Sequence, residues 1–580
     1  MRSSYRASPA AGREPSAGLA VCRQPGGLAA QGRQPGGFAA QGLQPGAALP
    51  VSRARPGRWL AVRGALVVLL LFGSLLTGCA SLPHGVERLP SHAAVPLPHG
   101  ALTRLAAASL EDQPGSSGFR LLPAGDQALE ALLALAGQAR ATLDAQYYLV
   151  SHDASGLRFL RALRDAAEHG VRVRLLIDDL YAAGQDGLLA GLAATPNLEV
   201  RMFNPLPARR GGVITRVVLS AHEFSRVNRR MHNKLFIADN ALAVTGGRNV
   251  GDAYFGRGQP ANFIDLDVLA AGPVVAELSA VFDRYWNSEH AYPVQSLAAS
   301  RQDGAAARQR FEAALQGLAD LPPPVAIDAL GQTAVGAQLR AGRLTLQKAP
   351  VRVLADRPGK VNAAANRAAT DDGTVAGLTL DLVGAAEAEV LLASPYFVPG
   401  RRSLETLRGA VAKNVRVSVM TNSLATTDEP LVHFGYARYR NTLLEMGVAL
   451  YELIPTTAHQ RTESALGLSG SLGRLHAKFA VVDRRHLFIG SMNMDPRSAR
   501  WNTELGLVID SAALAEQACG LLQGDQLPGS YQLRLAAPGR IEWVARQGGA
   551  EVVHAREPAS SALGQVRLWL RSQFVDEELL

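Results

Sequence analysis

The stretches 231–249 (MHNKLFIADNALAVTGGRN) and 475–493 (LHAKFAVVDRRHLFIGSMN) share one pattern, HxK(x)4D(x)6G(G/S)xN, and every interval in it is identical. Only 5 of the 580 residues are Lys, against 54 Arg, and 13 are His. Two of the five Lys nevertheless stand two places after a His, a coincidence that chance alone would give roughly once in two hundred sequences. The pattern therefore indicates a site that is written twice in the chain.

Each copy of the pattern supplies a His, a Lys, an Asp and an Asn, with a Gly or a Ser two positions before the Asn. The first copy has His232, Lys234, Asp239, Gly247 and Asn249, and the second has His476, Lys478, Asp483, Ser491 and Asn493. On a strand, H-x-K places the His and the Lys on one face, because side chains alternate with period two. A compact ammonium group beside an imidazole suits a phosphate oxygen, and the Gly-Gly or Gly-Ser step lets the backbone approach an anion.

Two copies that face each other provide what the cleavage of a phosphodiester requires. One His can attack the phosphorus, the other can protonate the leaving alkoxide, and two Lys can hold the charge on the phosphate oxygens. In many phosphoryl-transfer enzymes Mg²⁺ provides that neutralisation. Because fixed cations replace it here, and because Lys is a poor metal ligand, we predict no metal and no other cofactor.

Outward from the two copies, helices and strands alternate in the same order twice. The matching elements are expected at 126–140, 141–150, 156–170 and 171–180 in the first half, and at 374–386, 389–398, 402–414 and 415–424 in the second. Strands separated by helices predict α/β layers with a mostly parallel mixed sheet. We therefore expect two similar α/β domains, residues 101–330 and 331–540, related by pseudo-two-fold symmetry, and a C-terminal tail 541–580 without an assigned role.

The N-terminal prefix, residues 1–78, is expected to direct export rather than to form part of the folded domains. Residues 1–50 contain a Gly/Pro/Gln-rich repeat with nothing to pack, so we predict disorder there, or a mis-assigned start. Residues 51–78 combine Arg with a short apolar run, as a signal peptide does. The segment 76–80 (LTGCA) resembles a bacterial lipobox, which implies lipidation of Cys79, and 79–100 should be a flexible stalk.

Charge and cysteine content narrow the range of functions. The formal net charge is +9, but residues 1–78 carry nine Arg and one Glu, so the remainder is nearly neutral. A neutral chain lacks the basic footprint of nucleic-acid binding, so we expect no nucleic-acid partner. Three cysteines (Cys22, Cys79 and Cys519) exclude a disulfide framework and a Cys-based metal site. The 47% of hydrophobic residues allows sizeable cores.

The duplicated pattern resembles the phospholipase D superfamily in its two-motif, single-chain form, and the chain is similar to bacterial cardiolipin synthases, notably of the C type. The stretches 144–156 (DAQYYLVSHDASG) and 246–256 (GGRNVGDAYFG) support this resemblance, as does 421–453. It implies two phospholipase D-like domains with the active site at their interface and a covalent phosphohistidine intermediate. It also implies that Asp239 and Asp483 are structural.

The resemblance further assigns an orienting acid to each His. Glu504 lies 28 residues after His476 and is expected to serve the second half, and Asp265, with Asp267 as the alternative, is expected to serve the first. By the same resemblance His232 is the nucleophile and His476 the general acid, then base. One departure is Gly247 where the second copy has Ser491, which leaves a hydroxyl contact on the first side in doubt.

Several functions remain open from these residues. The leading hypothesis is a membrane-tethered phosphatidyltransferase that makes cardiolipin from phosphatidylglycerol, with phosphatidylethanolamine as a second candidate lipid. Water as the acceptor would make the protein a phospholipase D. Two further hypotheses are a phosphodiesterase acting on nucleic acid and a non-catalytic envelope protein. The expected location is the cell envelope, facing the periplasm, with the inner or outer membrane undecided and protein partners unknown.

Overall fold

The computed structural model describes residues 81–208, 212–297, 304–362, 373–455, 472–522, 529–547 and 549–560. The predicted repeat region 1–50, the signal peptide 51–78 and the lipidation site Cys79 lie outside these residues.

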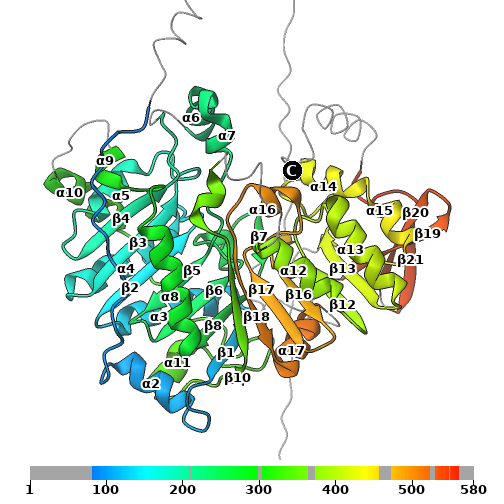
Figure 1. Ribbon diagram of the computed structural model, residues 1–580, viewed down its shortest axis with the longest axis horizontal. Helices are drawn as coiled ribbons and strands as arrows, with labels where there is room; N and C mark the ends of the chain where they lie inside the picture. The colour runs from blue at the N-terminus through cyan, green and yellow to red at the C-terminus, as the bar shows by residue number, and fades with distance from the viewer. Residues whose placement is uncertain are drawn as a thin grey trace, which may run out of the picture. The chain divides into compact units, whose positions relative to one another are not determined.

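The first half is built on a nine-stranded mixed sheet (Figure 1). Its strands, in spatial order, are β10 (Gln347–Ala349), β1 (Ser117–Leu122), β8 (Asp267–Ala271), β6 (Leu242–Gly246), β5 (Leu235–Ala238), β2 (Thr142–Tyr147), β3 (Arg172–Asp178), β4 (Leu198–Phe203) and β9 (Ala291–Pro293). Only the neighbouring pairs β2–β3 and β3–β4 are parallel. The other six pairs are antiparallel.

The second half repeats this sheet and extends it. Its ten strands, in spatial order, are β11 (Val351–Ala355), β18 (Leu505–Asp510), β17 (His486–Gly490), β16 (Phe479–Val482), β12 (Glu389–Ala393), β13 (Arg416–Asn422), β14 (Ala449–Leu453), β19 (Ser530–Ala537), β20 (Arg540–Gln547) and β21 (Ala550–His554). The seven strands that lie side by side from β11 to β14 match, one for one in spatial order, the seven that lie from β1 to β4 in the first sheet. Their parallel pairs, β12–β13 and β13–β14, are the equivalents of those in the first half.

The α/β class with two similar domains is confirmed, but the prediction of mostly parallel sheets is wrong. Helical crossovers link β2 to β3 and β3 to β4, and such crossovers produce parallel neighbours. The two copies of the motif, by contrast, form hairpins, β5–β6 and β16–β17, whose strands are antiparallel. Helix–strand alternation therefore predicted the crossovers correctly and overestimated how far they extend across each sheet.

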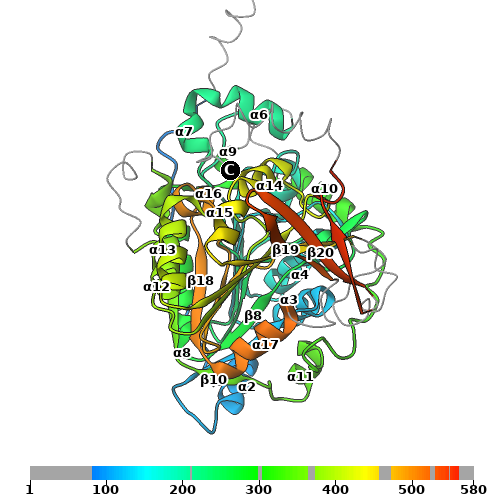
Figure 2. The ribbon, with the colours of Figure 1, turned by 90° about the vertical axis from the view of Figure 1, so that its right-hand side faces the viewer.

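Helices cover both sheets and form three apolar cores. The helices of the first half are α2 (Ala101–Ser109), α3 (Gly125–Gln138), α4 (Ala154–Glu168), α5 (Asp186–Leu192), α6 (Val213–Leu219), α7 (Phe224–Val227), α8 (Pro273–Trp286), α9 (Val294–Leu297), α10 (Gly304–Leu315) and α11 (Val335–Arg340). Those of the second are α12 (Val375–Gly384), α13 (Gly400–Ala412), α14 (Pro430–Ala437), α15 (Arg440–Glu445), α16 (Pro496–Arg500) and α17 (Ala512–Leu522). In Figure 2, α12 and α13 lie on one side of the strands and α3 and α4 on the other. Short 3-10 turns occur at Ala221–Glu223, Asp252–Tyr254 and Pro358–Val361.

The middle core joins the halves. It combines side chains of both sheets, such as Phe119 and Leu507, with the equivalent helices α8 and α17. The buried thiol of Cys519 lies in this core, in α17. Because the two halves bury apolar surface against each other, the relative position of the two motif copies is fixed by packing.

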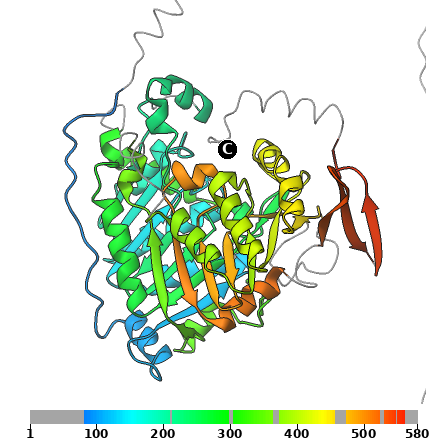
Figure 3. The same ribbon diagram turned by 45° about the vertical axis from the view of Figure 1, so that its right-hand side comes forward.

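The domain boundaries differ from those predicted. β10 ends the first sheet at Ala349 and β11 begins the second at Val351, so the division falls at Pro350 rather than after residue 330. Part of the predicted tail, up to His554, continues the second sheet as β20 and β21, which Figure 3 shows at its edge. β21 is exposed or half-buried along its whole length, so its sequence has no buried apolar face that would mark it as a strand.

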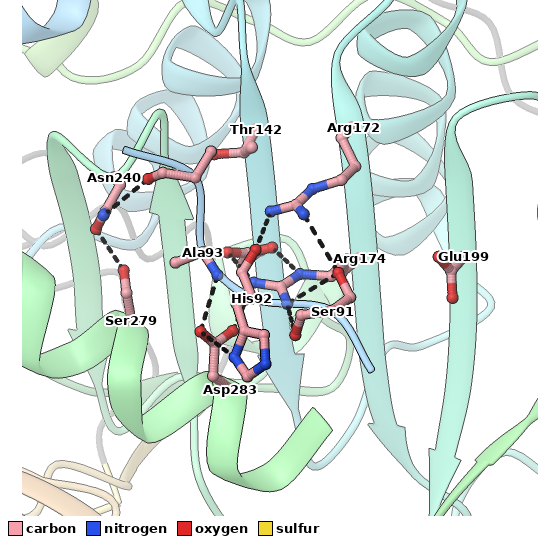
Figure 4. A network of polar contacts seen from close by, with 12 residues as sticks. Ser91, His92, Ala93, Thr142, Arg172, Arg174, Glu199, Asn240, Ser279 and Asp283 are labelled. Carbon is pink, nitrogen blue, oxygen red and sulfur yellow. Dashed lines mark hydrogen bonds and ion pairs between the residues drawn. The ribbon is translucent and has the colours of Figure 1, made fainter. Parts of the chain in front are cut away.

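The predicted flexible stalk is also wrong for the residues that follow Ser81. This segment runs along the first domain and is bonded to it (Figure 4). The backbone N–H groups of Ser91 and Ala93 donate to Asn287, just after α8, and to Asp283 of α8, at 3.0 and 2.8 Å. Arg174 donates to the Ser91 carbonyl oxygen at 2.8 Å and makes a two-bond pair with Asp144, at 2.6 and 2.7 Å. The segment is therefore a strap held by buried charge.

The strap and the Arg174 network predict a large cost for one substitution. Arg174 is fully buried and Asp144 almost so, so Arg174→Ala leaves a buried carboxylate without its partner. We expect a loss of about 3 to 5 kcal/mol in the free energy of unfolding. The exposed pair of Arg416 and Glu389 offers the control, and Arg416→Ala should cost less than about 1 kcal/mol. Denaturant unfolding followed by circular dichroism measures both; equal losses would contradict a structural role for the network.

Candidate active site

The two H-x-K segments lie immediately before strands rather than in them. His232 and Lys234 precede β5, which begins at Leu235, and His476 and Lys478 precede β16, which begins at Phe479. The expectation that H-x-K lies within a strand is therefore wrong, because each strand begins only at the residue after the Lys. The backbone of these segments is instead bound to the opposite half, and this contact determines where each His points.

Two backbone pairings connect the two halves of the chain at the site. β7 (Ala261–Ile264) of the first half pairs in parallel with β15 (Leu472–Leu475) of the second, and the backbone N–H of His476 donates to the carbonyl oxygen of Ile264 at 2.7 Å. Met231 pairs with Thr503 in the same way, and the N–H of His232 donates to Thr503 O at 2.9 Å. Each catalytic segment is thus attached to the stretch that precedes the other half's orienting acid.

The acids consequently serve the histidines crosswise. His232 Nδ1 lies 3.0 and 3.2 Å from the carboxylate oxygens of Glu504, and His476 Nδ1 lies 2.5 Å from Asp265 Oδ2. Both acids were identified in the sequence, but their assignment to the His of the same half is wrong. The alternative acid, Asp267, is paired with Arg248 at 3.2 Å and does not contact either His.

The difference between Gly247 and Ser491 follows from the acid each one faces. Ser491 donates its hydroxyl hydrogen to Glu504 and accepts the backbone N–H of Leu505 at 3.0 Å. A Cβ atom on Gly247 would lie 2.1 Å from Asp265 Oδ1, inside van der Waals contact. The first copy therefore has no hydroxyl contact to its acid because the shorter Asp265 occupies that space.

Both lysines are buried beside the histidines. Lys234 Nζ donates to the carbonyl oxygen of His232 at 2.7 Å, and Lys478 donates to that of His476 and lies 2.9 Å from its Nδ1. Burial lowers the pKa of Lys478 to about 8 and holds the pKa of Lys234 well below its usual range. Desolvated ammonium groups of this kind interact strongly with an anion.

The same burial keeps both imidazoles neutral. Burial and Lys478 lower the pKa of His476 to about 4, and burial with the two lysines holds the pKa of His232 well below its ordinary value.

The two orienting acids differ from each other in pKa. Burial raises the pKa of Glu504 to about 7, whereas His476 and Lys478 outweigh burial at Asp265 and lower its pKa. The carboxylate beside His476 is therefore the more firmly ionised one.

The remaining motif residues have separate places. The carboxylate of Asp239 accepts the backbone N–H groups of residues 140–142 at 2.7 to 3.0 Å, where β2 begins. Asp483 does the same at residues 387–389, before β12. Both aspartates thus contact backbone rather than the histidines, as a structural role requires. The Asn249 side chain donates to the Tyr254 hydroxyl at 2.9 Å, and among the described residues the buried Oδ1 of Asn493 has no donor.

Aromatic rings that the sequence did not single out surround the histidines. The Tyr148 ring lies 5.1 Å from His232, and the rings of Tyr254 and Phe263 lie 5.2 and 4.9 Å from His476. In the sequence, Tyr148 is the second of two adjacent Tyr residues at the end of a predicted strand, a position that does not by itself indicate a site. No sequence pattern marks Tyr254 and Phe263 as residues of the site, because they reach His476 only through the pairing of β7 with β15 between the two halves.

A cavity of about 310 Å³ extends from the second motif copy. Asn493 and Met494 contribute to it from one side, and the start of α13 with Arg401 and Arg402 from the other. Arg500 of α16 also lines it, together with apolar groups such as Leu380. Within the described residues, no three His, Cys, Asp or Glu side chains are grouped so as to hold a metal ion. The site thus combines cationic and apolar surface.

Comparison with known proteins identifies the family. The model of the "Cardiolipin synthase, PLD-like domain" family matches twice, at residues 132–286 and 379–523. The chain belongs to this family. It is 39% identical to cardiolipin synthase C of Escherichia coli (strain K12) over 483 residues, which are 83% of this chain and 100% of that protein. An uncharacterized protein of Helicobacter pylori is 30% identical, over 79% of this chain and 88% of its own length.

Among solved structures, phosphatidylserine synthase from Haemophilus influenzae Rd KW20 aligns with 81% of this chain and 97% of its own, at 14% identity and a TM-score of 0.49. The family match confirms the resemblance inferred from the duplicated pattern. Its two matched ranges each contain one copy of the HxK motif, as expected for cardiolipin synthases of the two-domain type.

The close approach of Gly247 to Asp265 yields a test of the crosswise pairing. Gly247→Ala would displace the buried Asp265 carboxylate from His476, because the new Cβ atom would lie only 2.1 Å from Asp265 Oδ1. We expect activity to fall about 10- to 100-fold through misorientation of His476. Gly409→Ala, in α13 with open space around the new methyl group, is the control and should retain activity. Full activity of Gly247→Ala would contradict the role of Asp265.

Proposed function

We propose that this protein makes cardiolipin by transferring a phosphatidyl group between two phospholipids through a phosphohistidine. As a member of the cardiolipin synthase family it is a phosphatidyltransferase that acts on phospholipids. The observation that carries the proposal is the pairing of two oriented histidines with two buried lysines where the halves meet. The donor lipid is phosphatidylglycerol or phosphatidylethanolamine, and the acceptor is phosphatidylglycerol.

In the first step Nε2 of His232 attacks the phosphorus of the donor lipid. An N–P bond forms, the P–O bond to the headgroup breaks, and His476 gives its proton to the departing alkoxide. Lys234 and Lys478 hold the non-bridging oxygens, and Glu504 accepts the Nδ1 hydrogen of His232, which leaves Nε2 free to attack. The released alcohol is glycerol or ethanolamine.

In the second step the acceptor's hydroxyl attacks the same phosphorus. His476 takes the hydroxyl proton, a new P–O bond forms, and the N–P bond to His232 breaks. The empty site holds neutral imidazoles because its lysines are buried with them. A bound phosphodiester anion offsets those positive charges and so raises the pKa of His476 toward the value a proton donor needs.

The unequal acids support this division of roles. An imidazole that gains and loses a proton benefits from an ionised carboxylate at Nδ1, as His476 has in Asp265 at 2.5 Å. His232 faces Glu504, whose pKa burial raises to about 7, and a nucleophile needs to stay neutral. The cavity beside Asn493, with its Arg groups and apolar wall, offers space for the phosphate and acyl chains of a second lipid.

The cellular lipid content tests the reaction. Expression of the wild type should raise cardiolipin, and His232→Ala should abolish the increase because no N–P bond can form. His169→Ala, a substitution at an exposed His of the first half, is the control and should behave as the wild type. Lipid mass spectrometry provides the measurement. Accumulation of phosphatidic acid in place of cardiolipin would identify water as the acceptor, and DNA cleavage alone would favour a phosphodiesterase acting on nucleic acid.

The covalent intermediate can be located in the wild type and in His232→Ala. Wild-type protein quenched during turnover should carry a phosphatidyl group on the peptide that contains His232, and His232→Ala should carry none. A label on His476 in the wild type would reverse the two roles.

We further propose that the protein is a lipoprotein of the cell envelope, anchored through Cys79 and facing the periplasm. The apolar run before LTGCA supports this, and the Ala after Cys79 favours the outer membrane. In the described part of the chain, no helix has the length and apolar character to span a bilayer. Metabolic labelling with a fatty acid should mark the wild type, and Cys79→Ser should lose the label. Retained label would contradict lipidation at this residue.

A further inference from the structure

Helices α6 and α7 expose apolar side chains next to the active site. Ile214 is 81% exposed, Val218 61% and Phe224 48%, and Leu219 is exposed as well. In the part of the chain that the structure describes, ten large hydrophobic side chains are exposed, and these four come from one eleven-residue segment. We call Ile214, Val218, Leu219 and Phe224 the apolar patch. Such a concentration marks an interaction surface rather than ordinary scattered exposure.

The orientation of α6 is the reverse of that of a helix facing water. Its exposed side carries Ile214, Val218 and Leu219, whereas its buried side carries Arg216, which is paired with Asp186 at the start of α5. A surface helix in water buries its apolar residues and exposes its charged ones. Because the ion pair fixes Arg216 inward, the apolar residues are held outward, as a helix at a lipid surface requires.

The patch is directly linked to the nucleophile. α7 ends at Val227, five residues before His232. A second link is aromatic: Tyr181, 43% exposed, packs edge-on against Tyr148 at 5.4 Å, and Tyr148 contacts His232 at 5.1 Å. The patch is therefore close to His232 along the chain, and the exposed Tyr181 connects the protein surface to His232 through Tyr148.

The strap begins beside the patch. In Figures 1, 2 and 3 the described chain starts next to α6 and α7 and then runs along the first domain. Its first residue, Ser81, follows Cys79 by two positions, and the apolar run of the prefix ends at Leu76. Because the strap is bonded to α8 and Arg174, only a short stretch of chain separates Cys79 from the part of the domain that the strap contacts.

We propose that the apolar patch inserts into the surface of a phospholipid bilayer and so presents the active-site entrance to membrane lipids. The inference deepens the proposed function and rests on it, because it concerns how the same site reaches its substrate. The occupant is a lipid surface rather than a protein, since the strap that begins beside the patch follows Cys79, the proposed lipidation site, by two positions. Insertion of four apolar side chains gives reversible binding that adds to the anchor.

A fluorescent probe tests insertion without relying on activity. Val218→Cys is labelled with an environment-sensitive dye in the full-length chain, with Cys22 and Cys79 replaced by Ser so that buried Cys519 is the only other thiol. Vesicles of phosphatidylglycerol and phosphatidylethanolamine should raise its emission about twofold or more, with a blue shift. The same dye at Ile327→Cys, exposed but distant from α6, is the control and should not respond.

Three outcomes would overturn the proposal. No response at position 218 while the protein sediments with the vesicles would exclude insertion of the patch. A response to higher protein concentration without lipid would indicate a second copy of the chain as the occupant. A dye already shielded in dilute, lipid-free protein would indicate that another segment of this chain covers the patch.

Kinetics provide the second readout. Ile214→Glu with Val218→Glu should lower the ratio of the rate on vesicle phosphatidylglycerol to the rate on monomeric dihexanoyl phosphatidylglycerol about tenfold or more. Ile327→Glu with Val553→Glu removes exposed apolar groups elsewhere and should keep the wild-type ratio. An unchanged ratio in the first variant contradicts docking. If the wild type fails to convert even the monomeric lipid, the proposed function fails, and the dye still decides whether the patch inserts.

Discussion

The crosswise bond between each histidine and the acid of the opposite half is the constraint on which the site depends. Glu504 orients His232 and Asp265 orients His476, and the β7–β15 pair and the Met231–Thr503 bridge hold the two crossings in place. Neither half alone contains a complete histidine–carboxylate pair. The shared core between the sheets is therefore a requirement of catalysis as well as of stability, because any shift between the halves would separate both pairs at once.

Burial gives this arrangement its chemistry. Two lysines inside a desolvated pocket, with neutral histidines beside them, form a site that favours a phosphodiester anion and supplies the charge that metal ions supply in other phosphoryl-transfer enzymes. The two sides are similar without being identical. Asp265 approaches its His more closely and requires Gly247, whereas the longer Glu504 is held by Ser491. Because of this asymmetry, the imidazole of His476, which faces the ionised Asp265, is better suited to carry a proton than that of His232.

The surroundings of the site suit a substrate that resides in a membrane. The strap fastens residues 81–94 to the first domain through the buried Arg174 network and neighbouring hydrogen bonds. The apolar patch lies near the start of that strap and five residues before His232. On the other side of the site, Arg groups and apolar side chains line a cavity next to Asn493. Both surfaces complement lipids, because the cavity combines cationic and apolar groups and the patch is apolar.

The sequence by itself determined the duplication, the α/β class, the six polar motif residues nearest the chemistry and both acids, because identical spacing in two copies is a local property of the chain. Tertiary structure alone decided which acid meets which histidine, how few strand pairs are parallel, and that the expected stalk is a strap. These features depend on contacts between residues hundreds of positions apart, 272 for His232 and Glu504 and 211 for His476 and Asp265. The spacing of residues along the chain does not reveal these contacts. Pairing between a strand of one half and a strand of the other leaves the pattern of apolar residues in both halves unchanged.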